Sequence, residues 1–123
     1  MKKEIRTNLA PLPAGPYSQG LLVGNRIYVA GQAGFHAATG KISSSVAEQT
    51  CQVLNNIKSI LEAAGASMDN VVKVTAHLSD MNDFAEYNSV YKNFFNEPFP
   101  VRTTVGSNLG DVIKVEIDVI AEI

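Results

Sequence analysis

One long amphipathic segment, residues 46–64, constrains the fold of this chain most, because it predicts a helix with a single apolar face. Ser45 and Glu48 have the spacing of a capping box at its start, and Gly65 follows its end, where glycine commonly terminates a helix. The apolar residues at helical spacing are Val46, Val53, Leu54, Ile57, Ile60, Leu61 and Ala64. Such a stripe needs a second layer of structure to cover it.

Two segments with alternating side chains supply that second layer. Residues 72–78 and 112–123 place apolar and polar side chains on opposite faces, which is the period of two that a β-strand requires. The apolar face of the first begins at Val72, and that of the second begins at Ile113. The polar faces carry Thr75 and His77 on the first strand and Glu116 and Asp118 on the second.

A hairpin is predicted nearer the N-terminus, where Gly24-Asn25 separates two short apolar runs, residues 21–23 and 27–29. Both turn residues suit a tight connection, so the two strands should be antiparallel neighbours. The proline-rich residues 7–16 before the hairpin are typical of an extended lead-in. Residues 31–44 after it are expected to form a loop, with or without a short strand.

A second helix is predicted after Asp80 and Asn82, either of which can cap its start. Pro98 and Pro100 end it, because proline lacks the amide donor that a helix needs. Its apolar and aromatic side chains are Phe84, Tyr87, Tyr91, Phe94 and Phe95.

The segment after these prolines, Phe99–Val105, predicts a short strand that carries an arginine. Val101, Thr103 and Val105 point one way, while Arg102 and Thr104 point the other. Arginine is a planar, permanently charged fork that can grip a carboxylate through two parallel hydrogen bonds. We interpret Arg102 as the residue that holds the carboxylate of a small substrate.

The order of the elements predicts an α+β fold of two layers, with two helices on one face of a mixed five- to six-stranded sheet. Residues 1–123 are expected to form a single domain. The opposite face would carry Thr75, His77, Arg102, Thr104, Glu116 and Asp118. Val112 and Ile120 lie on that face too, so we expect a closed homo-oligomer that covers it.

The charge balance and the single cysteine limit the partners and the compartment. Ten Lys and Arg are scattered among 12 Asp and Glu, which disfavours nucleic-acid binding because that requires clustered cations. Cys51 is alone, which excludes an internal disulfide and suits a reducing compartment. We expect no signal peptide, no membrane span and a cytoplasmic location. His36 and His77 have no partner at metal-binding spacing, so no metal site is predicted.

Segments along nearly the whole chain together resemble the reactive intermediate deaminase family, RidA/YjgF, whose members are also named endoribonuclease L-PSP. The segments are Gly15-Pro16-Tyr17-Ser18-Gln19-Gly20, Gly31-Gln32, Gln49, Asn56-Ile57-Lys58, Glu62-Ala63-Ala64-Gly65, Val72-Lys73, Met81-Asn82-Asp83-Phe84-Ala85, Asn88, Tyr91, Phe94-Phe95, Phe99-Pro100-Val101-Arg102 and Val115-Glu116-Ile117. The resemblance implies a chorismate-mutase-like fold and a homotrimer with clefts between its subunits. It also implies a cofactor-free 2-iminobutanoate/2-iminopropanoate deaminase, which hydrolyses imines and enamines such as 2-aminoacrylate to 2-oxo acids and ammonia.

The resemblance assigns roles to individual residues. Arg102 matches the arginine that pairs with the substrate carboxylate, and Glu116 matches the glutamate associated with the attacking water. Tyr17 matches an aromatic residue that lines the cleft, and Asn88 matches a residue of its surroundings. For the mechanism we further expect backbone groups near Gly31 and Thr104 to bind the nitrogen side of the substrate.

Other interpretations stay open at this point. Ala30 stands where active members often have serine, and Thr104 where they have cysteine. Both differences favour a non-catalytic trimer that binds small carboxylates or a protein partner. A second alternative is RNA cleavage or translation inhibition, which the net charge of −2 disfavours. On residue pattern alone, Arg102 and Glu116 also fit an ion pair across adjacent strands, and Asn88 fits a brace for a loop.

Overall fold

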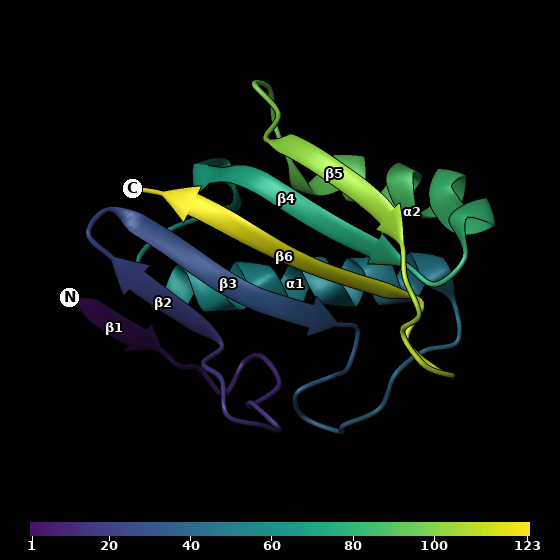
Figure 1. The fold of residues 1–123 in the computed structure, drawn as a ribbon, viewed down its shortest axis with the longest axis horizontal. Helices are drawn as coiled ribbons and strands as arrows, with labels where there is room; N and C mark the ends of the chain where they lie inside the picture. The colour runs from purple at the N-terminus through teal and green to yellow at the C-terminus, as the bar shows by residue number, and fades with distance from the viewer.

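Six strands form one mixed sheet in the computed structural model, which describes residues 1–123 (Figure 1). The strands are β1 (Lys2–Ile5), β2 (Gly20–Val23), β3 (Arg26–Ala33), β4 (Val71–Leu78), β5 (Val101–Gly106) and β6 (Val115–Glu122). Their order in the sheet is β1-β2-β3-β6-β4-β5, and only β4 and β5 run parallel. This confirms the predicted α+β fold with a mixed sheet of five to six strands.

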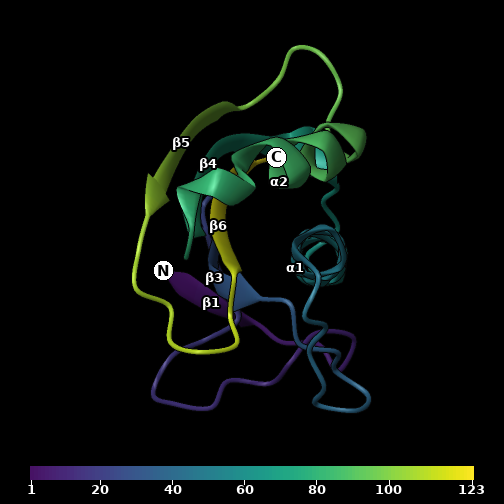
Figure 2. The ribbon, with the colours of Figure 1, turned by 90° about the vertical axis from the view of Figure 1, so that its right-hand side faces the viewer.

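The helices α1 (Val46–Ala63) and α2 (Phe84–Tyr91) both lie on one face of the sheet, as predicted (Figure 2). Two single turns of 3₁₀ helix extend α2, η2 (Met81–Asp83) before it and η3 (Lys92–Phe94) after it. A third turn, η1 (Met68–Asn70), precedes β4. Neither α1 nor α2 has the length and apolar character of a helix that crosses a membrane.

Both ends of α1 form where the sequence predicts them, although the capping box is only half formed. The Ser45 hydroxyl accepts a hydrogen bond from the Glu48 backbone N–H at 3.2 Å. The Glu48 carboxylate does not return to the Ser45 backbone and instead accepts from the Ser43 hydroxyl. Gly65 adopts φ of +78° after the helix, a conformation that glycine takes without steric cost.

The core lies between α1 and the sheet. Five apolar side chains of α1 are fully buried, Val53, Leu54, Ile57, Ile60 and Leu61. They belong to one cluster with strand residues that include Ile27, Val74, Ala76, Val115 and Ile117. Burial of each large apolar side chain contributes about 1.5–3 kcal/mol, so the sheet and α1 form a rigid support for the residues at their margins.

Three features of the strands differ from the prediction. β1 was not predicted, because three of its four residues are charged and show no alternation, yet it pairs with β2 along the edge of the sheet. β6 begins at Val115, so Val112 lies before the strand and is 55% exposed. In β4 the register shifts between Val71 and Lys73, which turns Val71 inward and Val72 outward.

The predicted hairpin is confirmed, and the strand after it is longer than expected. Val23 pairs with Arg26 across the turn, where Gly24 has φ of +59°. β3 continues to Ala33, so it occupies the first residues of the expected 31–44 loop. Its pairing with β6 is irregular between Val29 and Gln32. Bulges of this kind re-aim neighbouring side chains, and this one lies beside a predicted site residue, Gly31.

Candidate functional site

Arg102 lies against the aromatic side of α2. Its Nη1 donates a hydrogen bond to Oδ1 of Asn88 at 2.8 Å. The guanidinium carbon is 4.5 Å from the ring centroid of Tyr91 and 5.6 Å from the centroids of Phe84 and Tyr87. Cations are attracted to aromatic rings at these distances, so the three rings stabilise the guanidinium in this position. Asn88 accepts a hydrogen bond from one N–H of the guanidinium, which leaves most of the other N–H donors of Arg102 free for a ligand.

Helical spacing brings these side chains together. Phe84, Tyr87, Asn88 and Tyr91 follow one another at intervals that share a face of α2. A hollow of about 380 Å³ adjoins the guanidinium, and we call its lining the arginine cluster: Asn88, Tyr91, Lys92, Phe99, Pro100 and Arg102. Two of these residues are cations and none is acidic. The chemistry of the hollow therefore suits a small anion.

Glu116 lies in a second hollow. A Cβ atom on Gly31 would be 2.8 Å from Glu116 Oε2, so the carboxylate packs directly against the backbone of β3. Only glycine leaves this space. The hollow has a volume of about 480 Å³. We call its lining the glutamate cluster, which includes Tyr17, Gly31, Gln32, His36, Ile113 and Glu116 and contains no Lys or Arg.

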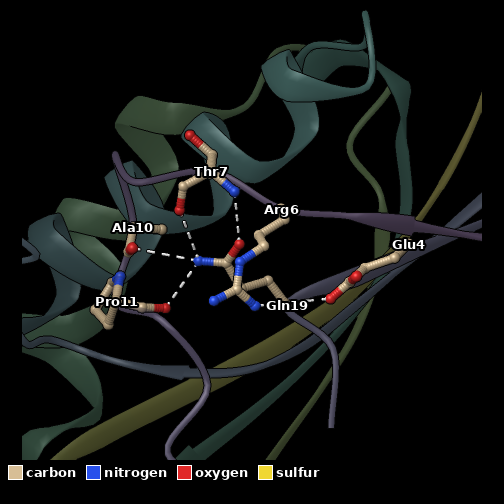
Figure 3. A network of polar contacts seen from close by, with 6 residues as sticks. All are labelled: Glu4, Arg6, Thr7, Ala10, Pro11 and Gln19. Atoms are coloured by element: carbon tan, nitrogen blue, oxygen red, sulfur yellow. Dashed lines mark hydrogen bonds and ion pairs between the residues drawn. The ribbon is translucent and has the colours of Figure 1, made fainter.

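A buried glutamine holds the segment that leads to Tyr17 (Figure 3). Gln19 is 1% exposed, and its amide nitrogen donates to the carbonyls of Thr7, Ala10 and Pro11 at 3.0, 3.2 and 2.8 Å. Its amide oxygen accepts from the Thr7 backbone N–H at 2.8 Å. These bonds tie the proline-rich lead-in to the start of β2 and so fix one wall of the glutamate cluster.

Gln49 performs the same task for the segment before Glu116. Its side chain is fully buried in α1, and its amide nitrogen donates to the carbonyls of Ser43 and Val112 at 2.7 and 2.9 Å. Its oxygen accepts from the Lys114 backbone N–H at 2.8 Å. A buried amide without partners is costly, so the two bonds to Val112 and Lys114 hold residues 112–114 against α1, and the third holds Ser43.

The residue pattern alone assigned no role to these amides, although a signal was present. Gln49 and Asn56 lie on the buried side of α1, where a polar side chain requires partners. Asn56 indeed donates to the carbonyls of Ala33 and Phe35, which line the glutamate cluster. The polar residues on the apolar stripe of α1 are therefore the ones that hold the backbone around the glutamate cluster in place.

We call the side of the sheet opposite the helices its open face. The prediction that Arg102, Thr104 and Glu116 share this open face is wrong. Arg102 pairs with Val74 and Thr104 with Ala76, both of which are buried toward the helices. The assignment failed because β5 is an edge strand whose valines, Val101 and Val105, are 67% and 39% exposed instead of forming the core.

Arg102 and Glu116 are also not on adjacent strands. β4 lies between β5 and β6, and Glu116 pairs with His77 on the face opposite the helices. The arginine cluster and the glutamate cluster share no residue. The alternative of an ion pair across neighbouring strands is therefore wrong. One chain brings Asn88, Arg102 and Thr104 together, and separately Tyr17, Gly31 and Glu116.

The open face of the sheet holds other ionisable groups outside both clusters. Burial raises the pKa of Asp118, while the charges of His77 and Lys73 act in the opposite direction. The His77 ring nitrogen Nδ1 lies 2.7 Å from the Ser107 hydroxyl oxygen. Apolar side chains are also exposed on the same face. One of them is Tyr28, which pairs with Ile120 and is 40% exposed.

The sequence and the fold both match known proteins. The Endoribonuclease L-PSP family matches residues 7–123. A RutC family protein of Pyrococcus horikoshii is 49% identical over 123 residues, and the 2-iminobutanoate/2-iminopropanoate deaminase of Escherichia coli K12 is 42% identical over 125 residues. Each match covers 98% of both chains. The crystal structure of Escherichia coli TdcF with bound serine superposes with a TM-score of 0.93 at 37% identity, again over 98% of both chains.

These matches extend over nearly the whole chain and agree with the motifs found along it. The chain therefore belongs to the Endoribonuclease L-PSP family, the reactive intermediate deaminase (RidA/YjgF) family of proteins.

Proposed function

We propose that this protein hydrolyses 2-imino acids and their enamine tautomers, such as 2-aminoacrylate, to 2-oxo acids and ammonia in the cytoplasm. The observation that carries the proposal is the arginine cluster, where a guanidinium with free donors adjoins a hollow without acidic residues. The deaminase name of the Escherichia coli relative supports the reaction. The serine bound to TdcF supports a ligand of amino-acid size and charge.

We further propose that the cleft forms between copies of the chain in a homotrimer. The arginine cluster can hold a carboxylate but contains no general base. The glutamate cluster contains a carboxylate base but no Lys or Arg to hold the substrate. Each cluster is thus half of a site, and the exposed apolar side chains of the open face, such as Val101, support its burial against another copy.

In the proposed reaction, Arg102 grips the substrate carboxylate and fixes the imine carbon C2 for attack by water. Glu116 accepts a proton from the water as its oxygen bonds to C2, and the C=N π electrons move to nitrogen. Glu116 returns that proton to the nitrogen of the carbinolamine, and the C–N bond then breaks with its electron pair leaving on nitrogen as ammonia. The electrons of the O–H bond form the carbonyl of the 2-oxo acid, and its proton passes to Glu116 and on to the departing ammonia. Backbone groups at Gly31 and Thr104 bind the nitrogen side.

A coupled assay tests this function. An amino-acid oxidase generates the imine from several amino acids in turn, and semicarbazide traps whatever imine has not been hydrolysed. We expect the protein to lower the yield of trapped imine in proportion to its concentration. If no amino acid gives this result, the protein is not an imine deaminase. The non-catalytic binder, which Ala30 favours by offering no hydroxyl beside Gly31, then becomes the better interpretation.

Two glycine variants separate the role of Glu116 from the stability of the fold. An alanine Cβ at Gly31 would meet the end of the flexible Glu116 side chain, so we expect Gly31→Ala to displace the carboxylate and remain folded. Imine hydrolysis should fall about 10- to 100-fold, because small displacements of a reacting group are costly.

The matched variant is Gly34→Ala, whose Cβ would lie 2.9 Å from the Gln49 backbone oxygen in α1. Backbone cannot swing away, so this variant should lose about 1–3 kcal/mol of unfolding free energy. Denaturant unfolding and the coupled assay measure both variants. Full activity of Gly31→Ala would contradict the role given to the Glu116 carboxylate.

A further inference from the structure

The strand that carries Arg102 is held from one side only. β5 is the edge of the sheet and pairs with β4 alone. Two polar contacts connect it to α2, and they start from alternate residues of the same face: Arg102 donates to Asn88, and the Thr104 Oγ1 atom lies 3.2 Å from the Tyr87 hydroxyl oxygen. The position of the guanidinium therefore depends on how firmly β5 is fixed to α2.

Tyr87 contacts both Arg102 and Thr104. Its side chain is fully buried, its ring centroid is 5.6 Å from the Arg102 guanidinium carbon, and its hydroxyl has Thr104 as its partner. A buried phenol that donates no hydrogen bond is costly, so the Tyr87 O–H donates and the Thr104 oxygen accepts. Thr104 is only half-buried, and its own proton remains free.

We propose that Tyr87 is a positioning residue of the site: its ring supports the Arg102 guanidinium, and its hydroxyl fixes Thr104 two residues further along β5. One buried side chain thereby sets the geometry of both residues that β5 contributes to substrate binding, Arg102 for the carboxylate and Thr104 for the nitrogen side. The inference rests on the proposed function, because it assigns Tyr87 to the recognition of the substrate carboxylate. It predicts that loss of the Tyr87 hydroxyl weakens binding more than it slows the chemical step.

Tyr87→Phe tests this directly, since it keeps the ring under Arg102 and removes the bond to Thr104. We expect KM for the imine, and the Kd for 2-oxobutanoate measured by calorimetry, to rise about five-fold, the effect of one hydrogen bond. The kcat value should change by less than about two-fold. Thr104→Val should give the same rise, and the double variant no more than either single variant, because both remove one bond. Thr104→Ser keeps the acceptor and should lose less than Thr104→Val.

Tyr28→Phe is the matched control, because it removes an exposed phenol on the opposite face of the sheet and should leave KM and Kd unchanged. An unchanged KM and Kd in Tyr87→Phe would overturn the inference, as would effects of Tyr87→Phe and Thr104→Val that multiply. A fall in melting temperature with wild-type KM would also overturn it, because Tyr87 would then be a purely structural residue. Absence of imine hydrolysis by the wild-type chain would refute the proposed function instead, and the Kd measurements would still report on Tyr87.

Discussion

Replacement of Arg102 by alanine is expected to lower kcat/KM for imine hydrolysis by about 100- to 10,000-fold. The variant loses two charge-assisted hydrogen bonds to the substrate carboxylate, each of which contributes about 1.5–3 kcal/mol. Arg102 is exposed in the single chain and its one hydrogen bond goes to Asn88, so the fold should survive. Steady-state kinetics in the oxidase-coupled assay measure the loss, and circular dichroism checks the fold.

Arg26→Ala is the matched control for this prediction. Arg26 is an exposed arginine on β3 whose Nε lies 3.6 Å from the Glu122 carboxylate, so its removal costs a surface ion pair and no ligand contact. We expect wild-type kinetics from it. Arg102→Lys should fall between the two, because lysine keeps the charge but lacks the planar fork. Activity of Arg102→Ala close to that of the wild type would show that the substrate carboxylate is held elsewhere.

Glu116→Gln is expected to lower kcat by about 100- to 10,000-fold with little change in KM, because glutamine keeps the size of the side chain but cannot accept a proton from water. The half-buried Glu116 forms no ion pair with Lys or Arg, so neutralising it leaves no cation without a partner. Single-turnover measurements separate the chemical step from binding.

Asp118→Asn provides the comparison for Glu116→Gln. Asp118 lies two residues further along the same face of β6 but does not line the glutamate cluster. Burial raises the pKa of Asp118 above that of an unfolded chain, so its negative charge opposes folding at neutral pH. The asparagine variant should therefore retain activity and be at least as stable at pH 7. Equal losses of activity in the two variants would mean that the reaction depends on the negative charge of this face of β6 in general and not on Glu116 in particular.

The sequence was sufficient for the elements whose patterns are local. The stripe of α1, its Ser45 and Gly65 boundaries and the Gly24-Asn25 hairpin are all decided by nearest neighbours along the chain. The same holds for the strand that carries Arg102 and for the aromatic stripe of α2. Residue pattern thus placed Arg102 on a strand and predicted the layer order, without knowledge of which strands are neighbours.

The errors arose where distant packing overrides local pattern. The valines of β5 alternate like core residues, yet Arg102 and Thr104 are the side chains that face α2, because β5 lies at the edge of the sheet beside that helix. A register shift in β4 exchanged the burial of Val71 and Val72 in the same way. Such exchanges depend on strand neighbours, which alternation alone does not specify.

The separation of the two clusters was equally beyond local pattern. It follows from β4 lying between β5 and β6, a matter of sheet order. Once that order is known, Arg102 and Glu116 cannot serve one substrate within one chain unless the fold changes. The proposed homotrimer resolves this, because another copy can bring its glutamate cluster to the arginine cluster.

Mixed assemblies of two inactive variants test this shared cleft most directly. Arg102→Ala and Glu116→Gln chains with different affinity tags are co-expressed and purified on both tags, so that every assembly contains both. A closed trimer of this kind keeps one intact cleft, so activity should return to about one third of the wild-type value. Pairs of differently tagged Arg102→Ala chains serve as the control and should stay inactive. If the mixed assemblies form but stay as inactive as either variant alone, the two clusters do not meet across copies, and a cleft shared between subunits is contradicted.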